Sequence, residues 1–180
     1  MAVQTILKMG NPKLYEPAEV VSHFDSNELY RTIRDMYDTM SAYEGAGLAA
    51  PQIGVPKQII IFGVPTPRYP NETDVPETVL INPEITVLTD AVEEYWEGCL
   101  SVPGFRGLVA RPRHIGYRGY DPKGNLIERE AVGFHARVVQ HEVDHVQGIL
   151  FPTLVRNLAY FGYEEEIGFD QIVKRVVNES

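Results

Sequence analysis

Residues 140–145 read QHEVDH, within a stretch from Gly133 to Gln147 whose apolar side chains do not keep to one side. At 3.6 residues per turn these side chains point in every direction around a helix axis, and a helix that is apolar on all sides is buried. The stretch therefore predicts a helix at the centre of the molecule, ended by Gly148. The apolar residues concerned are Phe134, Val138, Val139, Val143 and Val146.

Two histidines and a glutamate lie on this predicted helix with the spacing H-E-x-x-H. His141 and His145 are four residues apart, so both imidazoles share one face and can bind the same ion. Glu142 is about 100° around the helix from His141, where its carboxylate can reach a water molecule on that ion without binding the ion. The same spacing occurs by chance on ordinary helices. Polar groups on a buried helix need partners, however, and a metal ion supplies them.

The third ligand of such an ion has to come from elsewhere in the chain. Metzincin peptidases continue the motif to a third histidine, and this chain has Phe151 at that position. Thermolysin-like sites use a downstream glutamate, but the acidic run 164–166 is more typical of a solvated helix start. The remaining candidate is Cys99, in WEGCLS (96–101). A thiolate with two imidazoles is a tetrahedral set with its fourth position open, as a hydrolytic metal needs.

Several short apolar segments that precede the predicted helix favour β-strands. QIIIFGV (58–64) is a nearly continuous isoleucine-rich run, and TVLINPEITVL (78–88) contains two β-prone pieces broken at Asn82-Pro83. HIGYRGYD (114–121) and LIEREA (126–131) alternate in polarity around the turn PKGN, which predicts a hairpin. Strands around one central helix indicate the α+β class, with mostly antiparallel pairing.

The segment 25–45 predicts an N-terminal amphipathic helix, which Asp25 or Ser26 can cap. Residues 65–77 are rich in proline and polar side chains, which predicts a surface loop. DQIVKRVV (170–177) predicts a terminal helix. The apolar face of the first helix would be made by Leu29, Ile33, Met36, Tyr37 and Met40.

Composition narrows the class of protein. The 180 residues carry one cysteine and a formal charge of −9, so we expect a single domain over 1–180 without an intramolecular disulfide framework. Direct DNA binding needs clustered positive charge, and the one basic cluster, Arg106 to Arg113 with Arg118, is expected to be solvated or internally paired. No stretch resembles a signal peptide or a membrane span, so we expect a cytoplasmic location and no membrane partner.

Three motifs follow one another along the chain: GAGLAAPQ (45–52), EGCLS (97–101) and QHEVDH (140–145). By these motifs the chain resembles the peptide deformylases, from ILKMGNPKL near the N-terminus to about Phe151, and the tail beyond is uninformative. The resemblance implies removal of the formyl group from the N-terminal formyl-methionine of new polypeptides, with release of formate. It also implies an α+β fold whose central helix carries the histidines among antiparallel strands.

The resemblance also implies roles for the motif residues. Glu142 is expected to act as general base and acid, taking a proton from the attacking water and delivering it to the departing amine. The side-chain amide of Gln52 and the backbone N–H of Leu100 are expected to face the developing oxyanion. One divalent ion, Fe²⁺ or Zn²⁺, is expected to activate the water. Its expected ligands are Cys99, His141 and His145.

The substrate is expected to bind beside these residues. Its peptide would lie like an added strand against main-chain groups at Ala46 and Gly98, and Gly45 and Gly47 would let the loop approach closely. Its methionine side chain would enter an apolar pocket. Arg137 stands where many bacterial members of the family have an aliphatic pocket residue, which leaves the depth and preference of the pocket open. The pocket positions suggested by the resemblance are Ala46, Phe134 and Val138.

Charged residues near the motifs suggest two ion pairs. Glu97 and Arg106 resemble a carboxylate and an arginine that accompany the cysteine motif, with either a structural or a catalytic role. Arg111 with Asp144 is a second candidate pair. Three further histidines have no motif around them and are expected to be ordinary surface or hydrogen-bonded residues. They are His23, His114 and His135.

The expected partners are N-formyl-methionyl peptides and nascent chains near the ribosome, in the cytoplasm or in an organelle of a eukaryote. Two other classes compete with this hypothesis. A metallopeptidase that cleaves internal bonds is disfavoured by EGCLS and by the absence of a downstream ligand. A non-catalytic binding module on the same fold would be expected to have lost Glu142, Gln52 or a ligand, and none is lost.

Overall fold

The computed structural model of the chain describes residues 2–63 and 75–167. Its α-helices are α1 Asn27–Ala42, α2 Gly133–Val146 and α3 Glu164–Ile167. Its strands are β1 Gly47–Ala49, β2 Ile59–Phe62, β3 Thr78–Val87, β4 Val92–Cys99, β5 Val102–Pro112, β6 His114–Tyr120, β7 Leu126–Val132 and β8 Phe161–Tyr163.

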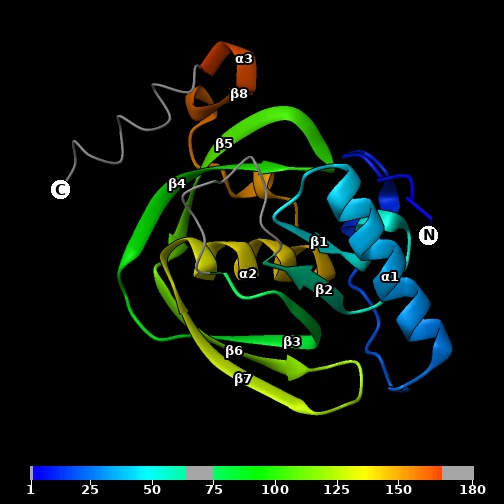
Figure 1. Ribbon diagram of the computed structural model, residues 1–180. Helices are drawn as coiled ribbons and strands as arrows, with labels where there is room; N and C mark the ends of the chain where they lie inside the picture. Colours follow the sequence, from blue (N-terminus) through cyan, green and yellow to red (C-terminus); the bar gives the residue numbers. More distant parts are fainter. Residues whose placement is uncertain (1, 64–74, 168–180) are drawn as a thin grey trace.

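The strands form two antiparallel sheets, with the orders β1-β2-β3-β6-β7 and β4-β5-β8. Helix α2 lies between the sheets and contacts strands of both, whereas α1 lies outside, beside β1 and β2 (Figure 1). The mixture of helices with antiparallel strands confirms the expected class.

Strand β2 is covered on both faces, which explains its continuous apolar sequence. Ile60 and Phe62 belong to the core around α2, whereas Ile59 and Ile61 belong to the core around α1. Successive side chains of a strand point to opposite faces, so a strand between two helices needs apolar residues at every position. Each such buried side chain contributes about 1.5–3 kcal/mol relative to an exposed one. The α1 residues in this core are Leu29, Ile33, Met36 and Met40, with Tyr37 packed against it.

Both long helices have defined ends. Helix α1 begins after Ser26, whose Oγ accepts a hydrogen bond from the backbone N–H of Leu29 at 3.2 Å. At the other helix, the carbonyl of Val146 accepts the backbone N–H of Ala18 at 2.8 Å, and Gly148 follows with φ 77°. The chain near the N-terminus therefore anchors the last turn of α2. Helix α2 buries side chains on all sides: Ala136, Arg137, Val138, Val139, Gln140, Glu142, Val143, His145 and Val146.

The strands before α2 differ in part from the sequence prediction. The hairpin of β6 and β7 is confirmed, with His114 opposite Val132 and Tyr120 opposite Leu126. The predicted break at Asn82-Pro83 is wrong, because β3 continues through it with a register shift between Ile81 and Glu84. Asn82 has a φ of 52°, so a single left-handed residue makes a bulge where the sequence indicated an end.

Strands β4 and β5 were not predicted at all. They pair from Val92 opposite Pro112 to Cys99 opposite Val102, and two of the four arginines of the basic cluster, Arg106 and Arg111, lie on β5. Charged and apolar residues are mixed along VEEYWEGC, so no simple alternation marks this strand. Arg106, Arg111 and Arg118 form ion pairs with Glu164, Glu97 and Glu84, which confirms internal pairing for these three arginines of the cluster.

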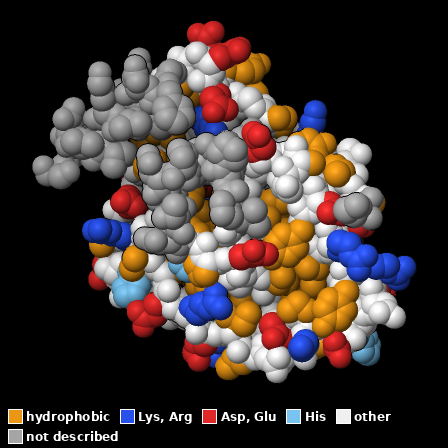
Figure 2. Space-filling view, viewed as in Figure 1, with side chains coloured by type: hydrophobic (Ala, Val, Ile, Leu, Met, Phe, Trp, Pro, Cys, Tyr) orange, Lys and Arg blue, Asp and Glu red, His pale blue; other side chains and the backbone are white. Residues whose placement is uncertain are grey.

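Two predicted segments fall at least partly outside the described residues. They are the loop 65–77, of which only the last residues are described, and the terminal helix 170–177. No helix within residues 2–63 and 75–167 is long and apolar enough to cross a membrane. On the face shown in Figure 2, Lys and Arg side chains are interspersed with Asp and Glu over the coloured part of the surface.

We expect replacement of Asn82 by alanine to destabilise the fold by about 2–3 kcal/mol. Asn82 accepts the backbone N–H of Val21 at 2.8 Å and donates to the carbonyl of Val21 at 2.9 Å, and both bonds would be lost. Alanine also tolerates the left-handed conformation poorly. Urea unfolding measures the loss. Asn82→Gly is the matched control, because glycine loses the two hydrogen bonds but readily adopts the left-handed conformation. Its free energy of unfolding should lie between those of wild type and Asn82→Ala. A loss below about 0.5 kcal/mol in Asn82→Ala would contradict this account.

Candidate metal centre and active site

Three side chains with metal-binding atoms meet where β4 ends against α2. Cys99 is the last residue of β4, and His141 and His145 stand one turn apart on α2. One ligand atom from each lies within 4.8 Å of the others, and Sγ of Cys99 is 3.2 Å from Nε2 of His145. Metal bonds to sulfur and imidazole nitrogen are about 2.0–2.3 Å long, so atoms at this spacing can share one ion. The structure brings together the ligand set expected from the sequence.

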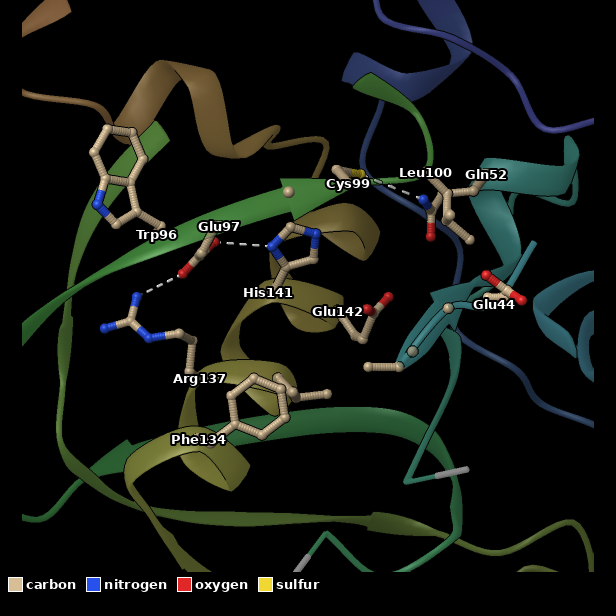
Figure 3. A pocket seen from close by; sticks show the side chains of 15 residues that line it. Glu44, Gln52, Trp96, Glu97, Cys99, Leu100, Phe134, Arg137, His141 and Glu142 are labelled. Carbon is tan, nitrogen blue, oxygen red and sulfur yellow. Dashed lines mark hydrogen bonds and ion pairs between the residues drawn. The ribbon is translucent and has the colours of Figure 1, made fainter. Parts of the chain in front are cut away.

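The ring of His141 is oriented by Glu97. Nδ1 of His141 lies 2.9 Å from Oε2 of Glu97 (Figure 3). Because Glu97 is ionised, Nδ1 carries the proton and donates it, which leaves the lone pair of Nε2 for an ion. A carboxylate behind a ligating histidine fixes its tautomer in this way in many metal sites. The donors therefore fit a metal ion by their chemistry as well as by their distances.

Glu97 is a buried charge with several partners. It is 5% exposed, and Arg111 binds both of its oxygens, with Nε 2.5 Å from Oε1 and Nη2 2.9 Å from Oε2. Arg137 donates from Nη1 to Oε1 at 2.7 Å. Burial by itself raises the pKa of Glu97, but the hydrogen bonds and charges of Arg111 and His141 outweigh burial and hold it well below its usual value.

The expected ion pairs near the motifs are partly corrected. Arg106 pairs with Glu164 of α3 at 2.8 Å, whereas the arginines on Glu97 are Arg111 and Arg137. Glu164, which the sequence placed in a solvated helix start, thus has a structural partner. Arg111 also binds Asp144 at 2.8 Å, which confirms the second pair.

Glu142 lies beside the ligand set with its carboxyl group enclosed. It is 5% exposed, and its Oε2 has no hydrogen-bond partner within residues 2–63 and 75–167. A Cβ added to Gly47 would overlap this carboxyl group, so β1 passes directly against it. Burial raises the pKa of Glu142 to about 7, and a nearby cation lowers such a pKa again. A carboxyl group of this kind can take up and return a proton near neutral pH.

Gln52 is fixed next to the cysteine. Its Oε1 accepts the backbone N–H of Ala49 at 2.8 Å, and its Nε2 donates to Oγ of Ser101 at 3.1 Å and lies 3.6 Å from Sγ of Cys99. The amide N–H group is therefore directed at the cysteine side of the site, where Leu100 also lies (Figure 3). The sequence analysis gave Ser101 no role, although its place in EGCLS was the signal that could have found it.

A single cavity joins the predicted residues. Every site residue predicted from the sequence lines it except His145, which is buried. Its wall also includes Glu44 and Trp96, which the sequence analysis did not single out although each is next to a motif. Figure 3 shows Phe134 on one side of the cavity and the head group of Arg137 turned towards Glu97. The remaining lining residues are Gly45, Ala46, Gly47, Gln52, Glu97, Gly98, Cys99, Leu100, Val138, His141 and Glu142.

A family model described as polypeptide deformylase matches residues 3–159. The chain belongs to the peptide deformylase family. A peptide deformylase 1 of Bordetella pertussis is 57% identical over 164 residues, which cover 91% of this chain and 93% of the relative. A peptide deformylase 1 of Nitrosomonas europaea is 54% identical over 166 residues, covering 92% of this chain and 94% of the relative. The resemblance carried by the three motifs is therefore confirmed.

Solved structures of peptide deformylases have the same fold. A class I type b enzyme of Acinetobacter baumannii, bound to Met-Ala-Ser, matches with a TM-score of 0.82 and 39% identity, covering 86% of this chain and 99% of the other. The enzyme of Thermotoga maritima matches with a TM-score of 0.78 and 32% identity, covering 87% and 100%. As a peptide deformylase, the chain is a metal-dependent hydrolase that removes the formyl group from N-terminal methionine.

The two histidines hold protons differently before an ion binds. Burial lowers the pKa of both rings. For His141 the hydrogen bonds and charges of Cys99 and Glu97 outweigh burial, so its pKa lies well above the usual value. For His145 the charge of His141 adds to burial, so its pKa lies well below the usual value. An ion bound by both rings would therefore have to displace a proton from His141 but not from His145.

We expect the affinity of the peptide deformylase for Zn²⁺ to rise with pH from 6 to 8. Below the raised pKa of His141 a proton competes with the ion, so this residue alone contributes about a tenfold gain per pH unit. Titration calorimetry of the metal-depleted protein in buffers of different ionisation enthalpy would count the protons released. An affinity that does not change across this range would contradict the combination of a raised pKa and a ligand role for His141.

Proposed function

We propose that the chain acts as one catalytic domain in which Cys99, His141 and His145 hold a single divalent ion, Fe²⁺ or Zn²⁺, for deformylation. The observation that carries this proposal is the meeting of three ligand atoms within 4.8 Å on a buried helix and the strand end beside it. A soft thiolate with two imidazoles suits both metals. Helix α2 would then be the metal-binding helix of the fold.

The chemistry divides between the ion and the side chains around it. Cys99, His141 and His145 would hold a divalent ion that, when bound, would supply Lewis-acid activation of water and of the formyl carbonyl. Glu142 accepts the proton of the attacking water at its carboxylate and donates it to the nitrogen of the departing amine. Its unpartnered Oε2, its burial and its raised pKa support this role, because each favours a carboxyl group that exchanges protons.

Gln52 and Leu100 stabilise the charge that develops on the formyl oxygen. The amide N–H of Gln52 and the backbone N–H of Leu100 are the proposed donors. Gln52 is suited to this task because Ala49 and Ser101 already hold both ends of its amide. A donor that is fixed beforehand needs no reorganisation as the charge appears.

The substrate binds along the same cavity. The peptide main chain lies against Gly45, Ala46, Gly47 and Gly98, and the methionine side chain enters between Phe134 and Val138. The structural neighbour bound to Met-Ala-Ser supports a peptide substrate that begins with methionine. We further propose that the substrates are nascent chains near ribosomes, in the cytoplasm, where formyl-methionine starts synthesis.

We expect formyl-Met peptides to be cleaved about a hundredfold faster than acetyl-Met peptides, or more. The acetyl methyl group would collide with the walls at Gly45, Gly47 and Leu100 and would move the carbonyl away from its donors. Matched peptides at equal enzyme concentration, with formate, acetate and peptide fragments quantified, make the comparison. Comparable rates on both substrates, or cleavage within a peptide that has a free amino terminus, would support a general metallopeptidase instead.

We expect Glu142→Gln to keep one ion per chain while kcat falls by about 10²–10⁴. The amide occupies the same space but cannot accept the proton. Cys99→Ser is the contrasting variant, because a hydroxyl stays largely protonated near pH 7 and metal affinity should fall sharply. Metal content by atomic emission and formate release are measured on both. Loss of the ion from Glu142→Gln would make Glu142 a ligand, and full occupancy in Cys99→Ser would remove Cys99 from the ligand set.

A further inference from the structure

The two ends of the Arg137 side chain have different surroundings. Its side chain lines the substrate cavity, yet the residue is only 5% exposed and its head group is turned from the cavity towards Glu97 (Figure 3). The sequence left open how an arginine would affect the pocket. In the structure the methylene groups of Arg137 form part of the apolar wall of the cavity, and its charged head group points away from the cavity towards Glu97.

Within the described residues, every hydrogen bond of the Arg137 head group goes to β4 or β5. Nη1 donates to Oε1 of Glu97 at 2.7 Å and to the carbonyl of Val109 at 2.9 Å, and Nη2 donates to the carbonyl of Glu93 at 2.6 Å. The ring of Tyr95 lies 5.7 Å from Cζ. A planar guanidinium held by three acceptors has one orientation, so it can act as a rigid support.

Glu97 connects Arg137 to His141, one of the proposed metal ligands. Arg137 and His141 are one turn apart on α2, and Glu97 bridges them, with Oε1 on Arg137 and Oε2 on Nδ1 of His141. Arg111 bonds to both oxygens from the other side. Without Arg137, the carboxylate would keep Arg111 but could pivot towards it and weaken its bond to His141.

We propose that Arg137 is a positioning residue, which acts through Glu97 to fix the imidazole of His141 in the orientation that binds the ion. The inference rests on the metal site proposed above. The competing explanation is that Arg137 only ties α2 to β4 and β5 through the carbonyls of Glu93 and Val109. In that case its loss would lower the stability of the fold and leave the ligand geometry unchanged.

The experiment compares Arg137→Met with wild type. Methionine keeps an unbranched apolar stem at the pocket and removes the charge and all donors. Zn²⁺ affinity is measured by competition with a chelator, and the visible absorption bands of the Co²⁺-loaded protein report the geometry around the ion. Loss of a partner behind a ligand weakens metal binding about 10–100-fold, so we expect a loss in this range together with shifted Co²⁺ bands.

Two further variants make the result specific. Asn82→Ala, which lies away from the cavity, is the control for lost stability and should leave Zn²⁺ affinity and the Co²⁺ bands unchanged. Arg137→Lys keeps the positive charge with fewer bonds and should restore part of the affinity. If Arg137→Met does not fold, Arg137→Lys alone tests the proposal, because its affinity for Zn²⁺ should still lie below that of wild type.

A double-mutant cycle with Glu97→Gln tests whether Arg137 acts on His141 through Glu97. If Arg137 acts through Glu97, replacing Arg137 in the Glu97→Gln protein should cause no further loss of Zn²⁺ affinity. Independent, additive losses would overturn the proposal, as would wild-type affinity and bands in Arg137→Met and Arg137→Lys. Failure of the proposed metal site is a separate result, because the wild-type protein would then bind no Zn²⁺ through Cys99, His141 and His145.

Discussion

The burial of α2 is the constraint on which the rest of the structure depends. This helix is enclosed on all sides, yet it carries Arg137, Gln140, His141, Glu142 and His145 in addition to its valines. Polar and charged groups in such a place cost several kcal/mol each unless they find partners. The smaller sheet supplies most of these partners. Glu97 and Arg111 from β4 and β5, and the carbonyls of Glu93 and Val109, all bind side chains of the helix.

The supporting charges of this layer are paired with one another. Glu97 and Asp144 are joined to Arg111 and Arg137 by ion pairs. What remains is a small set of buried atoms without protein partners in the described chain, among them Oε2 of Glu142 and Nδ1 of His145. Both of these atoms belong to α2. One is on Glu142, which we propose transfers the proton, and the other is on His145, which we propose as a ligand of the ion. The network thus satisfies the supporting residues and leaves Oε2 of Glu142, the proposed proton acceptor, without a partner in the described chain.

The sequence could predict the parts of this design that depend on local pattern. The apolar run around QHEVDH predicts a buried helix, and the three motifs predict which residues surround the cavity. It could not predict β4 and β5, because VEEYWEGC owes its place to pairing with the strand that directly follows it and to buried ion pairs, not to alternation. Glu97 was matched with Arg106 because the two resemble a family pattern beside the cysteine motif, whereas its partners in the structure are Arg111 and Arg137. The bulge at Asn82 was missed because a left-handed asparagine and a strand end have the same sequence signal.

Two glycines show how main chain and charge are brought together at this site. A Cβ at Gly47 would overlap the carboxyl group of Glu142, and a Cβ at Gly98 would overlap the guanidinium of Arg106. Each glycine therefore lets a charged group lie directly against a strand that lines the cavity. The two strands belong to different sheets, and both glycines line the cavity. In the binding mode proposed above, a substrate that lies there as an added strand would meet the main chain at both glycines. At Gly98 the atoms in the way belong to the far end of a flexible side chain, so a larger residue there would require the head group of Arg106 to move.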